Sequence, residues 1–176
     1  MNDTECNQDM VVRRYLEGVD QLHATIKKLN ESDLDLSLSK DSWTIRQIVH
    51  HIADGDSLWD SCILAALGNS EGVFSLQWYW DIPQNVWVDR WSYATRPVTL
   101  SLELFRISRT RMVDLINHIP DAWGRSIRVK WPDEIEERIS IGNAIEMQAN
   151  HTLGHIKDIE LICQANQLKD EASSSH

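Results

Sequence analysis

Apolar residues recur three and four positions apart in four stretches of this chain, which is the spacing that gathers side chains on one face of an α-helix. The predicted helices cover residues 9–30, 45–67, 98–118 and 140–168. In the second stretch the inward positions are Ile45, Ile48, Val49, Ile52, Trp59, Ile63 and Leu67. The pattern predicts an all-α fold, a four-helix bundle of up-and-down style with one long connection between helices two and three.

Local signals mark several ends of these helices. Thr44 to Gln47 fits a capping box, and Trp43 with Ile48 fits the matching hydrophobic staple. Gly68 and Asn69 follow the last inward residue of the second helix, and the third helix stops before Pro120. Ser140 is a candidate N-cap for the fourth helix.

The connection over residues 69–96 is too long for a simple turn, and such connections in compact domains are usually functional or disordered. Four tryptophans argue for order: Trp78, Trp80, Trp87 and Trp91. We expect these indoles either to wall a pocket over the mouth of the bundle or to form a dimer contact. A short hairpin is predicted from residues 127–131 and 138–141.

Length and charge narrow the class of protein. The 176 residues fit one domain, predicted over 1–169, with a disordered tail over 170–176. With 17 basic and 27 acidic residues the net charge is -10, which argues against nucleic acid as a partner. No long apolar run or N-terminal signal pattern is present, so we expect a cytoplasmic protein without a membrane span. The three cysteines, at 6, 62 and 163, show no CxxC spacing and are expected to be reduced and packed.

Candidate chemistry centres on histidines. His151 and His155 are four residues apart, so they share one face of the fourth helix, and the second helix contains His50 and His51. Three imidazoles around one ion would leave the open coordination position that a catalytic metal needs. Helical phase barely separates His50 from His51 as the third ligand. Two packed histidines without a metal are the competing interpretation of the HxxxH pair.

Asp56 falls near the middle of the inward stripe of the second helix, and a buried carboxylate needs a partner. It is either a catalytic group that takes a proton or holds an imidazole, or a buried acid paired with an arginine. Three arginines of the third helix, Arg106, Arg109 and Arg111, are expected on its solvated face.

The chain resembles the DinB/YfiT-like family of metal-dependent enzymes over nearly its whole length. The most specific segments are residues 43–54, Trp-Thr-Ile-Arg-Gln-Ile-Val-His-His-Ile-Ala-Asp, and residues 151–156, His-Thr-Leu-Gly-His-Ile. The family places its first metal histidine eight positions after the tryptophan, which is His51, and the other two at His151 and His155. A YfiT-like pattern can have a further histidine where this chain has Asp56.

The resemblance implies a four-helix bundle with a three-histidine site for a divalent metal ion, with zinc and nickel as the first candidates. The expected activity is that of a transferase or hydrolase in which the metal activates a thiol or water nucleophile. Its partners would be a small-molecule substrate, with a low-molecular-weight thiol as one option, and a second copy of the chain in a homodimer. The alternative is a metal-stabilised dimeric binding bundle without catalysis.

Overall fold

The computed structural model describes the backbone of residues 3–173 and the side chains of residues 7–167. Four long helices form the bundle: α1 (Asp3–Ile26), α2 (Ile45–Gly68), α5 (Thr99–His118) and α6 (Ile141–Ser173). The four-helix fold predicted from the periodicity is confirmed. Helix α1 begins and ends earlier than predicted, and α6 runs beyond residue 168 to Ser173. Residues 174–176 of the predicted tail lie outside the described part of the chain.

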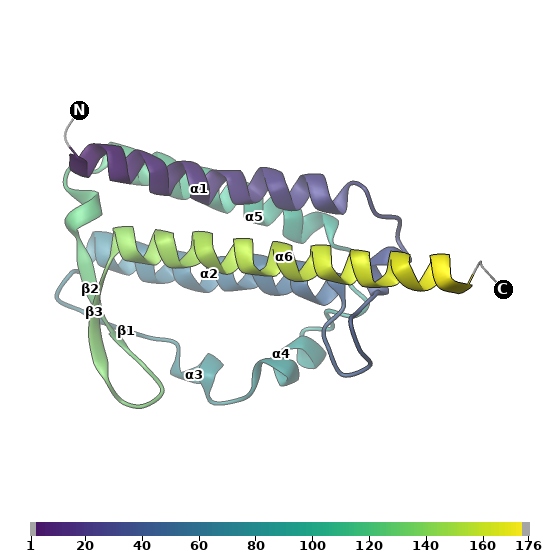
Figure 1. Ribbon diagram of the computed structural model, residues 1–176. Coiled ribbons are helices and arrows are strands. Elements are labelled where there is room, and N and C mark those ends of the chain that lie inside the picture. The colour runs from purple at the N-terminus through teal and green to yellow at the C-terminus, as the bar shows by residue number, and fades with distance from the viewer. Residues whose placement is uncertain (1–2, 174–176) are drawn as a thin grey trace.

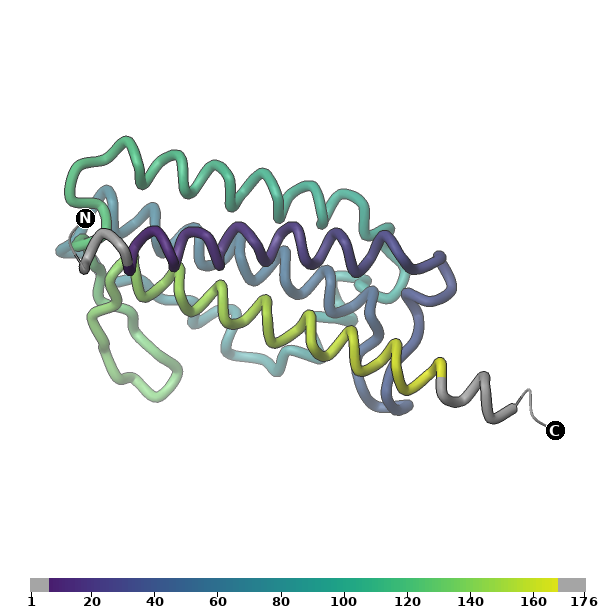
Figure 2. The backbone as a smooth tube through the Cα atoms, turned by 45° about the horizontal axis from the view of Figure 1, so that its top comes forward, coloured from purple at the N-terminus to yellow at the C-terminus, as the bar shows by residue number. Residues whose placement is uncertain are grey.

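The connectivity differs from a strict up-and-down bundle. Helices α1 and α6 run in one direction, and α2 and α5 run in the other (Figure 1). Each of α1 and α2 packs against both α5 and α6, so α1 and α2 lie on opposite corners of the bundle (Figures 1 and 2). The expectation of an up-and-down order was therefore wrong. The long crossover returns the chain along the bundle, and this lets α5 start at the same end as α2.

The crossover is built from short elements. It contains β1 (Val73–Ser75), α3 (Gln77–Trp80) and α4 (Gln84–Arg90), and it lies along α2 and α6 (Figure 1). The predicted hairpin is present as β2 (Ser126–Lys130) and β3 (Glu136–Ser140), which pair antiparallel. Sequence analysis missed β1, which adds a parallel third strand beside β2. Two 3₁₀ turns, η1 (Asp33–Asp35) and η2 (Ala122–Gly124), complete the chain.

The caps agree with the sequence signals. Thr44 and Gln47 form the reciprocal capping box at the start of α2, with the Thr44 N–H donating to Gln47 Oε1 over 2.8 Å. The backbone N–H of Asn143 donates to Ser140 Oγ at the start of α6. None of the helices in residues 3–173 combines the length and apolar character that a membrane span needs.

The core divides into two apolar clusters with a polar layer between them. One cluster, at the hairpin end, includes Tyr15, Ile63 and Met112, and the other includes Leu22, Ile52 and Phe105. Arg109 and Asp56 lie between them along α5 and α2, and both side chains are fully buried. Because burying a charge is costly unless it is paired, this layer must be satisfied internally.

The polar layer makes Gly18 of α1 sensitive to substitution. A Cβ there would lie 3.1 Å from Arg109 Nη1 and 3.3 Å from Thr152 Cγ2, and Arg109 is held by other contacts. We expect Gly18→Ala to lower the free energy of unfolding by about 1–3 kcal/mol through overpacking. Gly154 of α6 has no neighbour within 4 Å of such a Cβ. Gly154→Ala is the control and should stabilise the helix by about 0.5–1 kcal/mol. Urea unfolding measures both, and equal stabilisation by the two alanines would contradict the close approach.

Candidate metal centre

Three histidine side chains from two helices converge between α2 and α6. His51 Nε2 lies 3.1 Å from His151 Nε2, which lies 3.2 Å from His155 Nε2. One nitrogen of each ring falls within 4.8 Å of those of the other two rings, a separation at which one ion can contact all three. The i and i+4 positions on α6 provide two of these nitrogens because they lie one helical turn apart.

The surroundings favour neutral imidazoles that can act as ligands. Burial, followed by the neighbouring imidazoles His151 and His155, lowers the pKa of His51 to about 3. Burial is also the main cause that lowers the pKa of His151, to about 4, and the neighbouring His155 lowers it further. Both rings are therefore uncharged at neutral pH, with a lone pair available. Nitrogen atoms this close without a shared proton or ion would repel one another, so the donor set fits a divalent cation.

Asp158 orients the third imidazole. Its Oδ2 lies 3.1 Å from His155 Nδ1, and since an ionised carboxylate only accepts, Nδ1 must donate. The His155 Nε2 then keeps its lone pair toward the other two histidines. A carboxylate behind a histidine in this manner is a recurring feature of metal sites. Asp158 was not predicted as part of the site, although its position three residues after His155 places it on the same helical face.

His50 points away from the cluster into a different set of contacts. Its Nε2 donates to the Arg96 carbonyl over 3.1 Å, and its Nδ1 accepts from Ser101 Oγ over 2.8 Å. Both ring nitrogens are thus used in fastening α2 to the crossover and to α5. The structure brings His51, and not His50, to His151 and His155.

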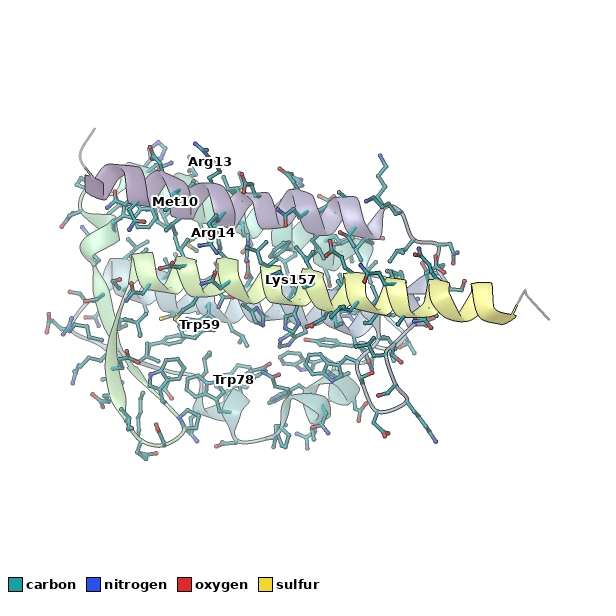
Figure 3. The ribbon with its side chains drawn as sticks, in the orientation of Figure 1. Met10, Arg13, Arg14, Trp59, Trp78 and Lys157 are labelled. Carbon is teal, nitrogen blue, oxygen red and sulfur yellow. The ribbon has the colours of Figure 1, made fainter. Side chains whose placement is uncertain are left out.

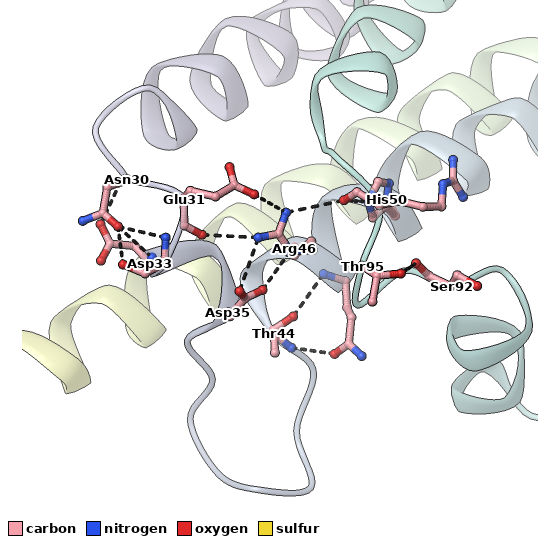
Figure 4. A network of polar contacts seen from close by, with 12 residues as sticks. Asn30, Glu31, Asp33, Asp35, Thr44, Arg46, His50, Ser92 and Thr95 are labelled. Atoms are coloured by element: carbon pink, nitrogen blue, oxygen red, sulfur yellow. Dashed lines mark hydrogen bonds and ion pairs between the residues drawn. The ribbon is translucent and has the colours of Figure 1, made fainter.

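Arg46 fixes the first turn of α2, one turn before His50 (Figure 4). Its side chain is buried and pairs with Asp35 at 2.7 Å and with Glu31 at 2.8 Å. It also donates to the Arg96 carbonyl over 3.4 Å, the acceptor that His50 uses. The position of the histidine pair along α2 is therefore set by contacts to the turn before the helix and to the end of the crossover.

Asp56 forms a buried ion pair with Arg109. Of the two roles that the sequence left open for it, this is the buried acid paired with an arginine. Arg109 Nε and Nη2 donate to its two carboxylate oxygens over 2.6 and 3.0 Å. Arg109 was expected on the solvated face of its helix, and this was wrong, because its side chain is fully buried. The guanidinium also donates to the Tyr15 carbonyl, the Gln148 carbonyl and Thr152 Oγ1. One side chain thus joins all four long helices directly behind His151.

A pocket of about 280 Å³ between the bundle and the crossover opens onto His51 and His151. It is lined mainly by aromatic and apolar side chains: Leu58, Trp59, Leu76, Tyr79, Trp80, Trp131 and Met147, with His51, Gly55, Gln84, Gln148 and His151. Of the four crossover tryptophans expected here, only Trp80 lines it. Trp87 and Trp91 pack in an aromatic group with Tyr79, and Trp78 is about half exposed. Trp59, predicted on the inward face of its helix, packs against the core and also lines the pocket, whereas Trp131 was not predicted there.

A match to a protein-family model shows which family this chain belongs to. The family model described as DinB superfamily matches residues 14–159, which is most of the chain. The chain belongs to the DinB superfamily. The matched region begins inside α1 and ends inside α6, and it contains all three converging histidines. The family resemblance seen in the sequence is therefore confirmed.

Named relatives of this DinB protein are described as metal-dependent. This chain is 26% identical over 161 residues to "Putative metal-dependent hydrolase OB0782" of Oceanobacillus iheyensis, and the match covers 89% of this chain and 88% of the relative. It is 25% identical over 150 residues to "Putative metal-dependent hydrolase YfiT" of Bacillus subtilis, covering 83% and 80%. The solved structure of that YfiT, titled a probable metal-dependent hydrolase with an unusual four-helix bundle topology, superposes with a TM-score of 0.76 at 22% identity, covering 89% of this chain and 86% of that one.

The two cysteines whose side chains the structure describes, Cys62 and Cys163, do not enter the site. Cys62 is buried among apolar residues, and this burial raises the pKa of its thiol to about 12. Cys163 is half-buried, and burial also raises its pKa. A thiol with a raised pKa is a poor nucleophile at neutral pH. The side chain of Cys6 lies outside the described residues.

Proposed function

We propose that this protein is a metal-dependent enzyme in which His51, His151 and His155 hold a divalent ion and the adjoining pocket holds the substrate. The convergence of three histidine Nε2 atoms beside an open pocket is the observation that supports it most. Zinc and nickel are the first candidates, since both accept imidazole ligands. A bound divalent ion supplies Lewis acidity, which lowers the pKa of a coordinated water or thiol toward neutrality.

The chain's own residues would prepare this chemistry. Asp158 keeps the lone pair of His155 directed inward, and Arg109 holds α6 against α2 through Thr152 and Asp56. Since Asp56 is engaged by Arg109 on both oxygens, we infer that it positions the helices and takes no proton from substrate. With a substrate in the pocket, its aromatic walls would limit the access of water to the reacting group, which would strengthen the electrostatic interactions there.

The nucleophile is proposed to come from a cosubstrate thiol or from water, because the described cysteines have raised pKa values. We expect the metal-loaded protein to act on a panel of electrophiles with small thiols, or on esters and amides with water. Chelation should abolish the activity, and Cys62→Ser with Cys163→Ser should retain it. If the metal-loaded protein is inactive both with thiols and in hydrolysis, the alternative of a dimeric binding bundle without catalysis is supported instead. Light scattering would then test the predicted homodimer.

The lowered pKa values predict few protons released when metal binds. At pH 6, three exposed imidazoles with pKa values near 6.5 would together lose about two protons to the solvent. Burial lowers the pKa of His51 to about 3 and that of His151 to about 4, so these two are already deprotonated at pH 6. We expect at most about one proton released per ion at this pH. Calorimetry of zinc binding in buffers of different ionisation enthalpy measures this number, and release of two or more would contradict the pKa directions.

A further inference from the structure

The pocket beside the histidines is free of charged side chains. Among the residues that line it there is no aspartate, glutamate, lysine or arginine, and their polar groups are all uncharged or imidazole: His51, His151, the amides of Gln84 and Gln148, the Tyr79 hydroxyl and the indole N–H groups. The buried Asp56, which the Gln148 amide contacts, is paired with Arg109. A charged group deep in this pocket would lose its hydration without gaining a partner from the protein.

Three indoles from distant parts of the sequence form one wall of this pocket. The ring centroid of Trp131, in the β2–β3 turn, lies 5.4 Å from that of Trp80 in α3 and 5.9 Å from that of Trp59 in α2. Figure 3 shows Trp59 projecting from the bundle toward the crossover. The wall is therefore assembled only when crossover, hairpin and bundle have come together, and it presents a contiguous aromatic surface.

The wall is also held in a fixed orientation. The Gln148 amide satisfies its neighbours when its nitrogen donates to Asp56 Oδ1 over 3.0 Å and its oxygen accepts from Trp59 Nε1 over 3.3 Å. Trp59 is thereby tied to the Asp56–Arg109 pair in the centre of the bundle. Preorganised aromatic surfaces bind ligands with little loss of side-chain freedom.

We propose that this pocket binds an uncharged, planar aromatic group of the substrate and so selects aromatic acceptors. Flat rings stack on indole faces in offset or edge-to-face arrangements. A cationic group is disfavoured because no carboxylate lines the pocket. In the metal-free protein an anionic group has no cation to meet it, because no lysine or arginine lines the pocket. That the reacting end of such a molecule faces the histidines rests on the proposed function, whereas the selection of the aromatic group does not.

The test compares four probes of similar shape on metal-free protein: naphthalene methanol, naphthylmethylammonium, naphthoate and the saturated decalin methanol. We expect naphthalene methanol to bind at least tenfold more tightly than each of the other three, measured by calorimetry or ligand-observed NMR. Undetectable binding of naphthalene methanol, or tighter binding of either ion or of the saturated alcohol, would overturn the proposal.

Two tryptophans of α3 provide a matched pair of variants. Trp80→Leu removes part of the wall and should weaken naphthalene methanol binding about tenfold. Trp78, two residues earlier, is outside the pocket and about half exposed, so Trp78→Leu should leave binding within twofold. Trp131→Leu provides a second removal from a different element, and circular dichroism confirms that each variant is folded. Equal effects of the Trp78 and Trp80 changes would place the probe elsewhere and refute the assignment.

The outcome is separable from that of the proposed function. If naphthalene methanol binds as expected but His51→Ala leaves metal binding and activity intact, the histidine proposal fails while the aromatic pocket stands. If metal binding depends on His51 but none of the probes binds, the pocket assignment fails alone.

Discussion

Arg109→Met should lower the free energy of unfolding by about 3–5 kcal/mol, because it leaves Asp56 as an unpaired charge in the centre of the bundle. The guanidinium makes five hydrogen bonds to acceptors on the three other long helices, and the residues that provide these acceptors are all buried. It also lies between two aromatic rings, 4.0 Å from the Tyr15 centroid and 4.3 Å from that of Phe105. Chemical unfolding followed by circular dichroism measures the change.

Arg106 on the same helix provides the control. Its pair with Glu103 is about half exposed on both sides, and exposed pairs contribute about 0–1 kcal/mol. Arg106→Met should therefore change the stability little. A double variant, Arg109→Met with Asp56→Leu, should recover much of the loss, since removing both charges leaves no unpaired ion. Equal effects of the two single methionine variants would show that the buried pair does not hold the bundle together.

The burial of Arg109 could have been predicted from the sequence. Phe105, Arg109, Met112 and Ile116 follow the same three-and-four spacing, so helical phase alone places the arginine on the buried face of α5. Asp56 has the same inward phase on α2. Two opposite charges on inward faces predict a buried pair. The expectation of Arg109 on a solvated face followed instead from the general preference of arginine for exposed positions.

Other features depend on contacts that no local pattern encodes. The capping box at Thr44 and the hairpin were predictable because each is formed by neighbouring residues. The parallel pairing of β1 with β2 and the meeting of Trp131 with Trp59 depend on how the crossover returns along the bundle. Helical phase left the choice between His50 and His51 open, and only the family resemblance selected His51. The physical reason lies in tertiary contacts, since Ser101 and the Arg96 carbonyl engage His50.

The two adjacent histidines of α2 should respond to alanine in opposite ways. We expect His51→Ala to weaken zinc or nickel binding by more than about a hundredfold, since even residues that only support a ligand contribute about 10- to 100-fold. The reason is geometric: His51 Nε2 is one of three nitrogens that face a common point, and the two on α6 cannot complete the set alone. Competition with a chromophoric chelator at neutral pH measures the affinity.

His50→Ala should instead keep the metal and lose stability. Its imidazole is buried and engaged at both nitrogens, so its removal leaves Ser101 and the Arg96 carbonyl without their partner, at a cost of about 1–3 kcal/mol. Cobalt substitution adds a spectroscopic readout, because the intensity of the visible bands reports the ligand geometry in either variant. If His50→Ala loses the metal while His51→Ala keeps it, the proposed ligand set is wrong, and the convergence of His51 with the α6 pair has another purpose in this bundle.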